Sequence, residues 1–134
     1  MQMTPTLQFQ GICADAISFY RDAVGAEVLF QLPFAGNVDP QYLKPELADK
    51  IMRAALRIGG TEIYLSDGHC TGEPLFQGIS LTLRMNSREE AERIAQSLGE
   101  GGKVRLLPPS PRGRTFCTLF DKFGVHWIVE VAQR

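Results

Sequence analysis

Apolar and polar residues alternate in several short runs of this chain, and a segment with helical spacing follows the first of them. Residues 7–10 alternate as a strand with one buried face does. From about Ala14 to Val24, apolar residues recur at steps of three and four, and Gly25 follows, which predicts an amphipathic helix that ends at glycine. Residues 27–32 form a second predicted strand. Two β-rich runs that meet at Gly59 and Gly60 predict a hairpin over residues 51–67.

The same order of elements returns in the second half of the chain. Residues 78–85 alternate again, and Ser87 with Glu90 forms a capping-box pattern at the start of a predicted helix that runs to Leu98. A strand over residues 103–107 and a hairpin over residues 115–131 complete the unit. The intervening segments 33–49, 68–77 and 108–114 are rich in proline, glycine and polar residues and predict connections.

The sequence therefore predicts the same order of elements in both halves of the chain: one strand, one helix and three strands. We predict an α+β fold in which two βαβββ modules form one curved, mostly antiparallel eight-stranded sheet with both helices on its convex face. The 134 residues form a single predicted domain, with module one at about residues 1–67 and module two at about residues 78–134. The concave cleft is the expected ligand site.

Composition excludes several classes of partner. Charged residues make up 22% of the chain and the net charge is −1, which favours neither nucleic acid nor an anionic membrane surface as partner. No apolar run approaches the ~18 residues of a membrane span, and the N-terminus lacks a secretory pattern, so we expect a cytoplasmic protein. Cys13, Cys70 and Cys117 lie far apart and are expected to be free thiols.

Several motifs resemble those of a known family. They are residues 9–20, 25–27, 56–60 with Ser66 and Asp67, 101–103, and 121–127, of which the first and last are the most specific. Together they resemble the PhnB-like branch of the vicinal oxygen chelate superfamily, which includes glyoxalase I, extradiol dioxygenases and the fosfomycin and bleomycin resistance proteins. The resemblance covers nearly the whole chain. It implies the paired-module fold and a homodimer in which subunits complete each other's clefts.

The resemblance also implies where a metal would be held. Metal-dependent members place ligands on the first and last strands of each module, at positions that fall here at or near Thr4, Tyr64, Ser80 and Ile128. None of these is His, Asp or Glu, so we expect no metal at that site and no cofactor. Arg53 stands where relatives often carry a histidine, and its permanent positive charge would attract a carboxylate or phosphate.

Polar side chains that alternate with the core residues form the predicted site. A small organic or anionic ligand would contact a set of residues on the concave face: Gln8, Arg53, Tyr64, Ser80, His126 and Glu130. The acid–base candidates among them are His126, Glu130 and Tyr64. Arg112 and Arg114, in a proline-rich loop, would gate the cleft or remain solvated loop charges. Polar alternates on any half-exposed sheet look similar, so this set is equally compatible with a surface role.

Three functional hypotheses follow. The first is a PhnB-like protein that binds a small molecule without the usual metal, with catalysis left open. The alternative is a metal-dependent glyoxalase or dioxygenase-type lyase or isomerase with displaced ligands, for which the only donors would be His69, His126, Glu62 and Glu130. The third is a protein that acts mainly through its homodimer interaction.

Three further features of the sequence have a possible chemical role: two cysteine positions and one glycine-rich segment. His69 and Cys70 are adjacent and could act as a thiol with its base, whereas Cys117 is expected in the core or in a cavity. The family also carries a ubiquinone-pathway methyltransferase label. We reject that activity because the glycine-rich segment 99–102 follows a predicted helix, whereas a nucleotide-type glycine loop follows a strand.

Overall fold

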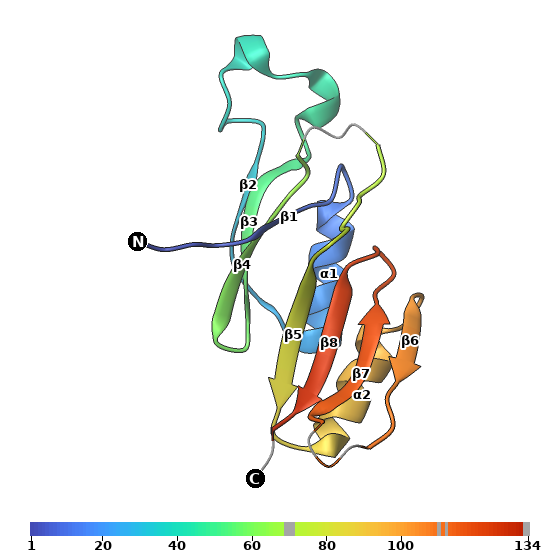
Figure 1. The fold of residues 1–134 in the computed structure, drawn as a ribbon. Helices are drawn as coiled ribbons and strands as arrows, with labels where there is room; N and C mark the ends of the chain where they lie inside the picture. Colours follow the sequence, from blue (N-terminus) through green and yellow to red (C-terminus); the bar gives the residue numbers. More distant parts are fainter. Residues whose placement is uncertain (69–71, 110, 112, 133–134) are drawn as a thin grey trace. The chain divides into compact units, whose positions relative to one another are not determined.

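The computed structural model describes residues 1–68, 72–109, 111 and 113–132. The chain divides into two compact units, Met1–Pro74 and Leu75–Arg134. Each unit contains one strand, one helix and three further strands in that order, so each is one of the two predicted βαβββ modules (Figure 1).

Module one contains strands β1 (Thr6–Gln8), β2 (Glu27–Pro33), β3 (Ile51–Ile58) and β4 (Thr61–Ser66) and helix α1 (Cys13–Val24). The strand order in its sheet is β1-β4-β3-β2. β1 pairs with β4 in parallel, and the other pairs are antiparallel. Helix α1 ends at Gly25, whose left-handed φ of 67° is a conformation that glycine adopts without steric cost.

Module two repeats this arrangement with strands β5 (Ser80–Met85), β6 (Lys103–Leu106), β7 (Thr115–Phe120) and β8 (His126–Val131) and helix α2 (Arg88–Leu98). The strand order is β5-β8-β7-β6, and β5 pairs with β8 in parallel. Ser87 caps α2, since its hydroxyl accepts from the Glu90 amide at 3.1 Å, as the sequence predicts.

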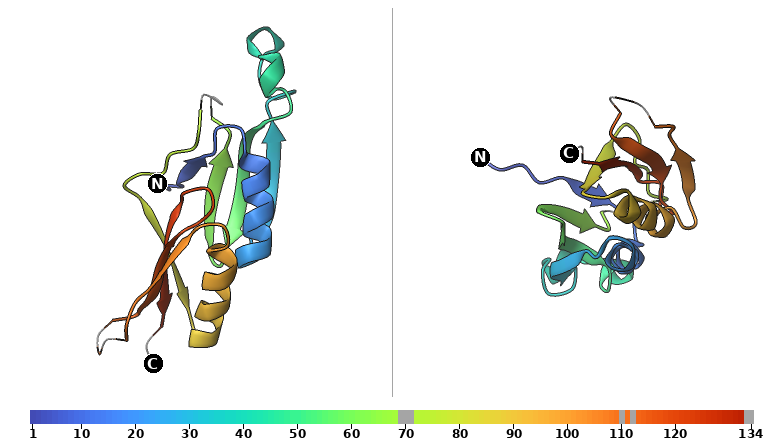
Figure 2. Two further views of the ribbon diagram at one scale, coloured as in Figure 1. Left: turned by 90° about the vertical axis from the view of Figure 1, so that its right-hand side faces the viewer. Right: turned by 90° about the horizontal axis from the view of Figure 1, so that it is seen from below.

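The predicted α+β fold of two βαβββ modules is confirmed. Among the described residues the strands are hydrogen-bonded as two four-stranded sheets, one in each module, where we predicted one continuous eight-stranded sheet. In each module the helix lies against one face of its own sheet (Figure 2). The long connection over residues 33–49 also contains two short 3₁₀ helices, η1 (Pro40–Tyr42) and η2 (Pro45–Leu47). Each begins with a proline, which fits there because the first helical residues need no amide donor.

Alternation divides each sheet into a core face and a polar face. In module one, Leu7, Ile63 and Leu65 are buried on the side of α1, whereas Gln8 and Glu62 are exposed. In module two, Trp127, Val129 and Leu119 are buried on the side of α2. The predicted assignment of these residues to sheet faces is therefore confirmed within each module.

A buried aspartate, Asp67, holds two segments of module one together. The Asp67 carboxylate, 1% exposed, accepts from the amides of Gly11, Cys13 and Ile51, each at 2.8 Å. It thereby ties the turn before α1 to the start of β3. Because each of these donors would otherwise be an unpaired amide, Asp67 is a structural residue.

Candidate polar sheet-face sites

On the polar face of module one, an arginine and two aromatic rings form a cluster that we call the Arg53 cluster. It consists of Arg53, Tyr64 and Phe30. The Arg53 guanidinium carbon lies 5.0 Å from the centre of the Tyr64 ring, and the Phe30 and Tyr64 ring centres are 6.3 Å apart. Ala55 lies between Tyr64 and Phe30 in the strand register. Its small side chain leaves the two larger rings room to meet above it.

Two arginines on this face have different electrostatic surroundings. Arg57 lies between two carboxylates, with Glu27 at 3.4 Å and Glu62 at 3.3 Å. Arg53, four residues earlier on β3, has no carboxylate within ion-pair distance in the described part of the chain. Its charge is therefore available to a ligand, and the aromatic face beneath it stabilises that charge by a cation–π interaction.

The remaining candidate of module one is Gln8. It lies on β1 in register with Ser66, and its side-chain oxygen lies close to Gly68 at the end of β4. The Ser66 hydroxyl donates to the Met52 carbonyl at 2.8 Å and accepts from the Gly68 amide at 3.0 Å. Gln8 thus lies on the same sheet face as the Arg53 cluster, at the β1 edge.

On the polar face of module two, a second cluster contains Ser80, His126 and Phe120, and we call it the His126 cluster. Ser80 and His126 are register partners, and the Ser80 hydroxyl lies 2.6 Å from His126 Nδ1. The His126 and Phe120 ring centres are 4.7 Å apart. The hydroxyl donates to Nδ1 in one tautomer of the neutral imidazole and accepts from Nδ1–H in the other, and either bond leaves Nε2 to meet a ligand.

Glu130 is engaged elsewhere on the same strand. Its carboxylate accepts from Arg84 Nε at 3.3 Å and from Arg84 Nη2 at 3.2 Å. The register places Ser80 opposite His126 and Arg84 opposite Glu130, so the two pairs lie at separate positions along β5 and β8. Glu130 is therefore less suited than His126 to act as a free base.

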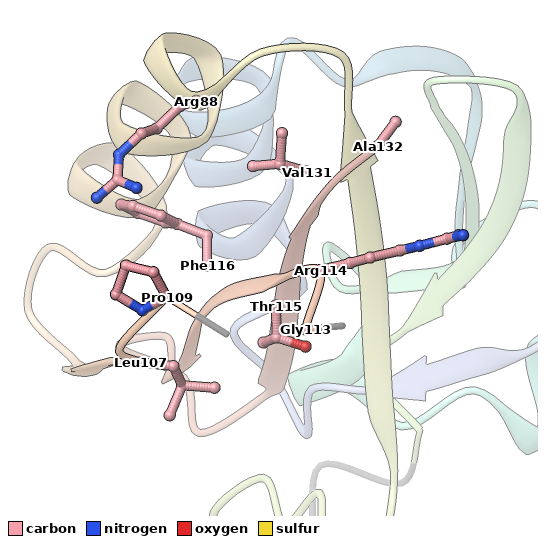
Figure 3. A pocket seen from close by; sticks show the side chains of 9 residues that line it. All are labelled: Arg88, Leu107, Pro109, Gly113, Arg114, Thr115, Phe116, Val131 and Ala132. Carbon is pink, nitrogen blue, oxygen red and sulfur yellow. The ribbon is translucent and has the colours of Figure 1, made fainter. Parts of the chain in front are cut away.

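Arg114 lines a cavity of about 240 Å³ in module two. The cavity is also lined by Arg88, Leu107, Pro109, Gly113, Thr115, Phe116, Val131 and Ala132. The Arg88 guanidinium carbon lies 5.3 Å from the Phe116 ring centre. Figure 3 shows the Arg114 side chain extending away from Phe116 and Pro109. The anion-gate role of Arg114 stays a prediction, and Arg112 lies outside the described residues, as do His69 and Cys70.

Sequence reasoning missed three side chains that share these faces. Phe30 and Phe120 are 39% and 49% exposed, which is unusual for large aromatic side chains. Lys103 is in register with Phe120 and extends the row of the His126 cluster. Alternation of charged and apolar residues in 103–106 is the signal by which Lys103 could have been found.

The four positions that correspond to the superfamily's metal ligands do not fit a divalent metal. Tyr64 lies under Arg53, Ser80 is bonded to His126, and Ile128 carries only an alkyl side chain. Thr4, which precedes β1, adds one more hydroxyl. Neutral hydroxyls without an imidazole or carboxylate form a poor ligand set. Within the described ranges, no three His, Cys, Asp or Glu side chains are grouped so as to hold a metal ion.

Two thiols lie in the core. Cys13 and Cys117 are fully buried and free. The prediction that Cys117 lies in the core is therefore confirmed. Burial raises the pKa of the Cys13 thiol well above its usual range, and the neighbouring Asp67 charge raises this pKa further. Burial also raises the pKa of Cys117. Since the thiolate is the reactive form, neither thiol is suited to nucleophilic chemistry.

The glycine-rich segment 99–102 has a packing role. Gly99 caps the C-terminus of α2, and a side-chain carbon at Gly102 would collide with the Phe120 carbonyl oxygen. The segment follows a helix, as expected. Its glycines permit close packing between the end of α2 and β7.

No helix in the described part of the chain is long and apolar enough to cross a membrane.

Two repeated βαβββ modules match the α+β fold of the vicinal oxygen chelate superfamily. The profile of the family described as 3-demethylubiquinone-9 3-methyltransferase matches residues 1–130. The chain is 31% identical to Protein YjdN of Escherichia coli K12, and the alignment covers 100% of this chain and 97% of YjdN.

Solved structures agree with this assignment. Protein PA1353 from Pseudomonas aeruginosa is 34% identical, with a TM-score of 0.82 and coverage of 100% of this chain and 99% of that protein. The PhnB protein from Bacillus cereus shares the fold at 21% identity, with a TM-score of 0.80 and coverage of 98% and 100%. The fosfomycin resistance protein FosX from Listeria monocytogenes, solved with Mn(II) and sulfate, shares the fold at 12% identity, with a TM-score of 0.66 and coverage of 99% and 90%. The profile match and the similarity to YjdN therefore show that the chain belongs to this family, the PhnB-like branch of the vicinal oxygen chelate superfamily.

Proposed function

We propose that this protein binds a small anionic organic molecule on the polar face of its module-one sheet, with Arg53 as the anchor and no divalent metal at the superfamily's usual position. The observation that carries the proposal is the contrast between Arg57, which is neutralised by two carboxylates, and Arg53, which lies over Tyr64 without a carboxylate partner among the described residues. An exposed guanidinium offers paired donors to a carboxylate or phosphate.

The aromatic members of the Arg53 cluster suit the organic part of such a ligand. Phe30 is 39% exposed and tilted by 49° relative to Tyr64, so both rings offer apolar surface next to the guanidinium. A ligand with a carboxylate or phosphate on a small apolar or planar body matches this pairing of charge and ring. Gln8, on the same sheet face, would add a polar contact.

The His126 cluster offers acid–base groups on the polar face of the module-two sheet. An imidazole can act as a general acid or base, and the Ser80 hydroxyl lies within hydrogen-bond distance of Nδ1 of the His126 ring. Tyr64 is the second acid–base candidate. The proposal is a binding function, and it does not extend to methyl transfer, because segment 99–102 is explained by packing. A cytoplasmic homodimer belongs to the same proposal, and light scattering of the purified protein tests the dimer.

Small carboxylates and phosphates should be screened by thermal shift, because a ligand that binds only the folded state raises the melting temperature. We expect Arg53→Gln to weaken the best ligand by about 10- to 100-fold, the equivalent of a lost charge-assisted hydrogen bond. Arg57→Gln is the matched control, since it removes an arginine from the same strand face and should leave the affinity within about twofold. Equal losses in both variants would overturn the assignment.

A further inference from the structure

Strand β6 is an open edge of the module-two sheet. In the strand order β5-β8-β7-β6, it pairs only with β7 among the described residues, and Figure 1 shows it at the outer side of that sheet. Just beyond β6, the Leu107 amide donates to the Phe116 carbonyl at 3.1 Å. Bonded and non-bonded residues alternate in antiparallel ladders. The backbone groups of Lys103 and Arg105 therefore face β7, and those of Val104 and Leu106 point outward.

The side chains of the outward-facing residues are apolar. Val104 and Leu106 are register partners of Leu119 and Cys117, which are core residues, so they lie on the α2 side of the sheet. They remain 45% and 67% exposed. Together they line a groove of about 570 Å³ whose other walls are Arg88, Glu92, Ala95, Gln96, Leu107 and Phe116. An apolar groove thus runs along a strand edge whose outward backbone donors and acceptors have no strand partner in the described part of the chain.

The opposite side of the same strand is cationic. Lys103 and Arg105 are in register with Phe120 and Thr118 and are exposed. Neither has a carboxylate within ion-pair distance in the part of the chain that the structure describes. β6 therefore presents positive charges on one side and an apolar groove on the other.

The charges of β6 disfavour pairing with a second copy of β6 and favour a strand with acidic residues. If the β6 strands of two copies paired antiparallel, with Val104 opposite Val104 or Leu106, the cations of one copy would face the cations of the other. Like charges directly opposite one another destabilise a sheet. A strand whose acidic residues alternate with apolar residues has the complementary pattern, since its acids face Lys103 and Arg105 while its apolar side chains enter the groove.

We propose that β6 binds an extended segment of a partner protein in which acidic and apolar residues alternate, added antiparallel as a fifth strand. Backbone hydrogen bonds to Val104 and Leu106 would provide affinity, and the two faces would provide specificity. The site is independent of the Arg53 cluster, which lies in module one.

The test uses the full chain and synthetic hexapeptides with blocked ends. The sequence Glu-Val-Glu-Val-Glu-Val is the probe, and Glu-Glu-Glu-Val-Val-Val and Lys-Val-Lys-Val-Lys-Val are controls. Amide hydrogen exchange followed by NMR should show at least tenfold slower exchange at Val104 and Leu106 with the probe alone. Arg105→Glu should weaken probe binding at least tenfold and permit binding of the lysine peptide. Arg93→Glu, on an exposed position of α2, is the control and should change neither affinity.

Three results would overturn the proposal. The first is unchanged exchange at Val104 and Leu106 with the probe at millimolar concentration. The second is equal binding of the alternating and block peptides, which would indicate non-specific charge attraction. The third is protection of these amides that rises with protein concentration without peptide, which would make a second copy the occupant.

Discussion

The indole nitrogen of Trp127 donates a hydrogen bond of 2.9 Å to the Asp121 carboxylate inside the core of module two. The same carboxylate accepts from the amides of Phe123 at 2.9 Å and Val125 at 3.1 Å, and Asp121 is only 3% exposed. The β7–β8 turn and the largest buried side chain of the module are thus held by one acidic residue.

Loss of the Asp121 carboxylate should destabilise the protein strongly. Asp121→Ala leaves the Trp127 donor and two amides without their acceptor, and each unpaired buried group costs about 1–3 kcal/mol. We expect the free energy of unfolding to fall by roughly 3 kcal/mol or more in urea denaturation. Asp22→Ala, on an exposed position of α1, is the control and should change stability by less than about 0.5 kcal/mol. Similar effects of the two substitutions would contradict the structural role of Asp121.

Substitution by alanine should change the stability of the protein differently at two glycines, Gly102 and Gly60. A side-chain carbon at Gly102 would collide with the Phe120 carbonyl oxygen, whereas one at Gly60 would meet nothing within 4 Å. Gly102→Ala should therefore destabilise the protein by about 2 kcal/mol or more, since backbone has to move. Gly60→Ala should stay within about 0.5 kcal/mol. Thermal or urea unfolding of the two variants tests this, and a tolerated Gly102→Ala would refute the close approach.

Periodicity predicted much of the fold because each signal was local. The capping serine Ser87, the glycine at the end of α1 and the alternation in the strands depend on residues close together in sequence. Those signals also place Arg53, Tyr64 and His126 on polar faces. They do not determine which side chains become neighbours, because Ser80 and His126 are 46 positions apart and meet only through the parallel register of β5 and β8. The ion pairs of Arg57 and Glu130 depend on cross-strand register in the same way.

We predict that the Ser80 hydroxyl donates to His126 Nδ1 and thereby favours the tautomer that carries its proton on Nε2. We expect nitrogen chemical shifts of the neutral form of the His126 ring, measured by NMR, to indicate one dominant tautomer in the native protein. Ser80→Ala removes the hydroxyl and should produce a mixture of tautomers. Thr82→Ala, two residues along β5, is the control. Ser87→Ala would not serve, because Ser87 caps α2. Identical tautomer ratios in Ser80→Ala and native protein would show that the hydroxyl does not orient the ring.

The buried thiol of Cys13 predicts a pH dependence of stability. Burial raises the pKa of Cys13 in the folded state, so above the usual thiol pKa of about 8.5 only the unfolded state releases this proton. Stability is therefore retained below that pH and falls as pH rises above it, by up to about 1.4 kcal/mol per pH unit. The free energy of unfolding between pH 8 and 10 should fall more steeply in native protein than in Cys13→Ala. Parallel pH profiles would contradict this.

The Arg84–Glu130 ion pair should contribute little to stability. The Arg84 side chain is 59% exposed and that of Glu130 is 21% exposed, so solvent screens the attraction. A double-mutant cycle with Arg84→Gln and Glu130→Gln should give a coupling of about 0.3–1 kcal/mol that decreases in high salt. A larger, salt-independent coupling would indicate a more rigid pair than these exposures imply.

Calorimetric titration of metal-free protein tests the central claim most directly. The protein should be treated with chelator, checked for metal by elemental mass spectrometry, and titrated with the best small carboxylate or phosphate from the screen. The Arg53 anchor predicts unchanged affinity without metal and a loss of about 10- to 100-fold in Arg53→Gln. Binding that requires one equivalent of divalent metal, or that persists in Arg53→Gln, would contradict the account.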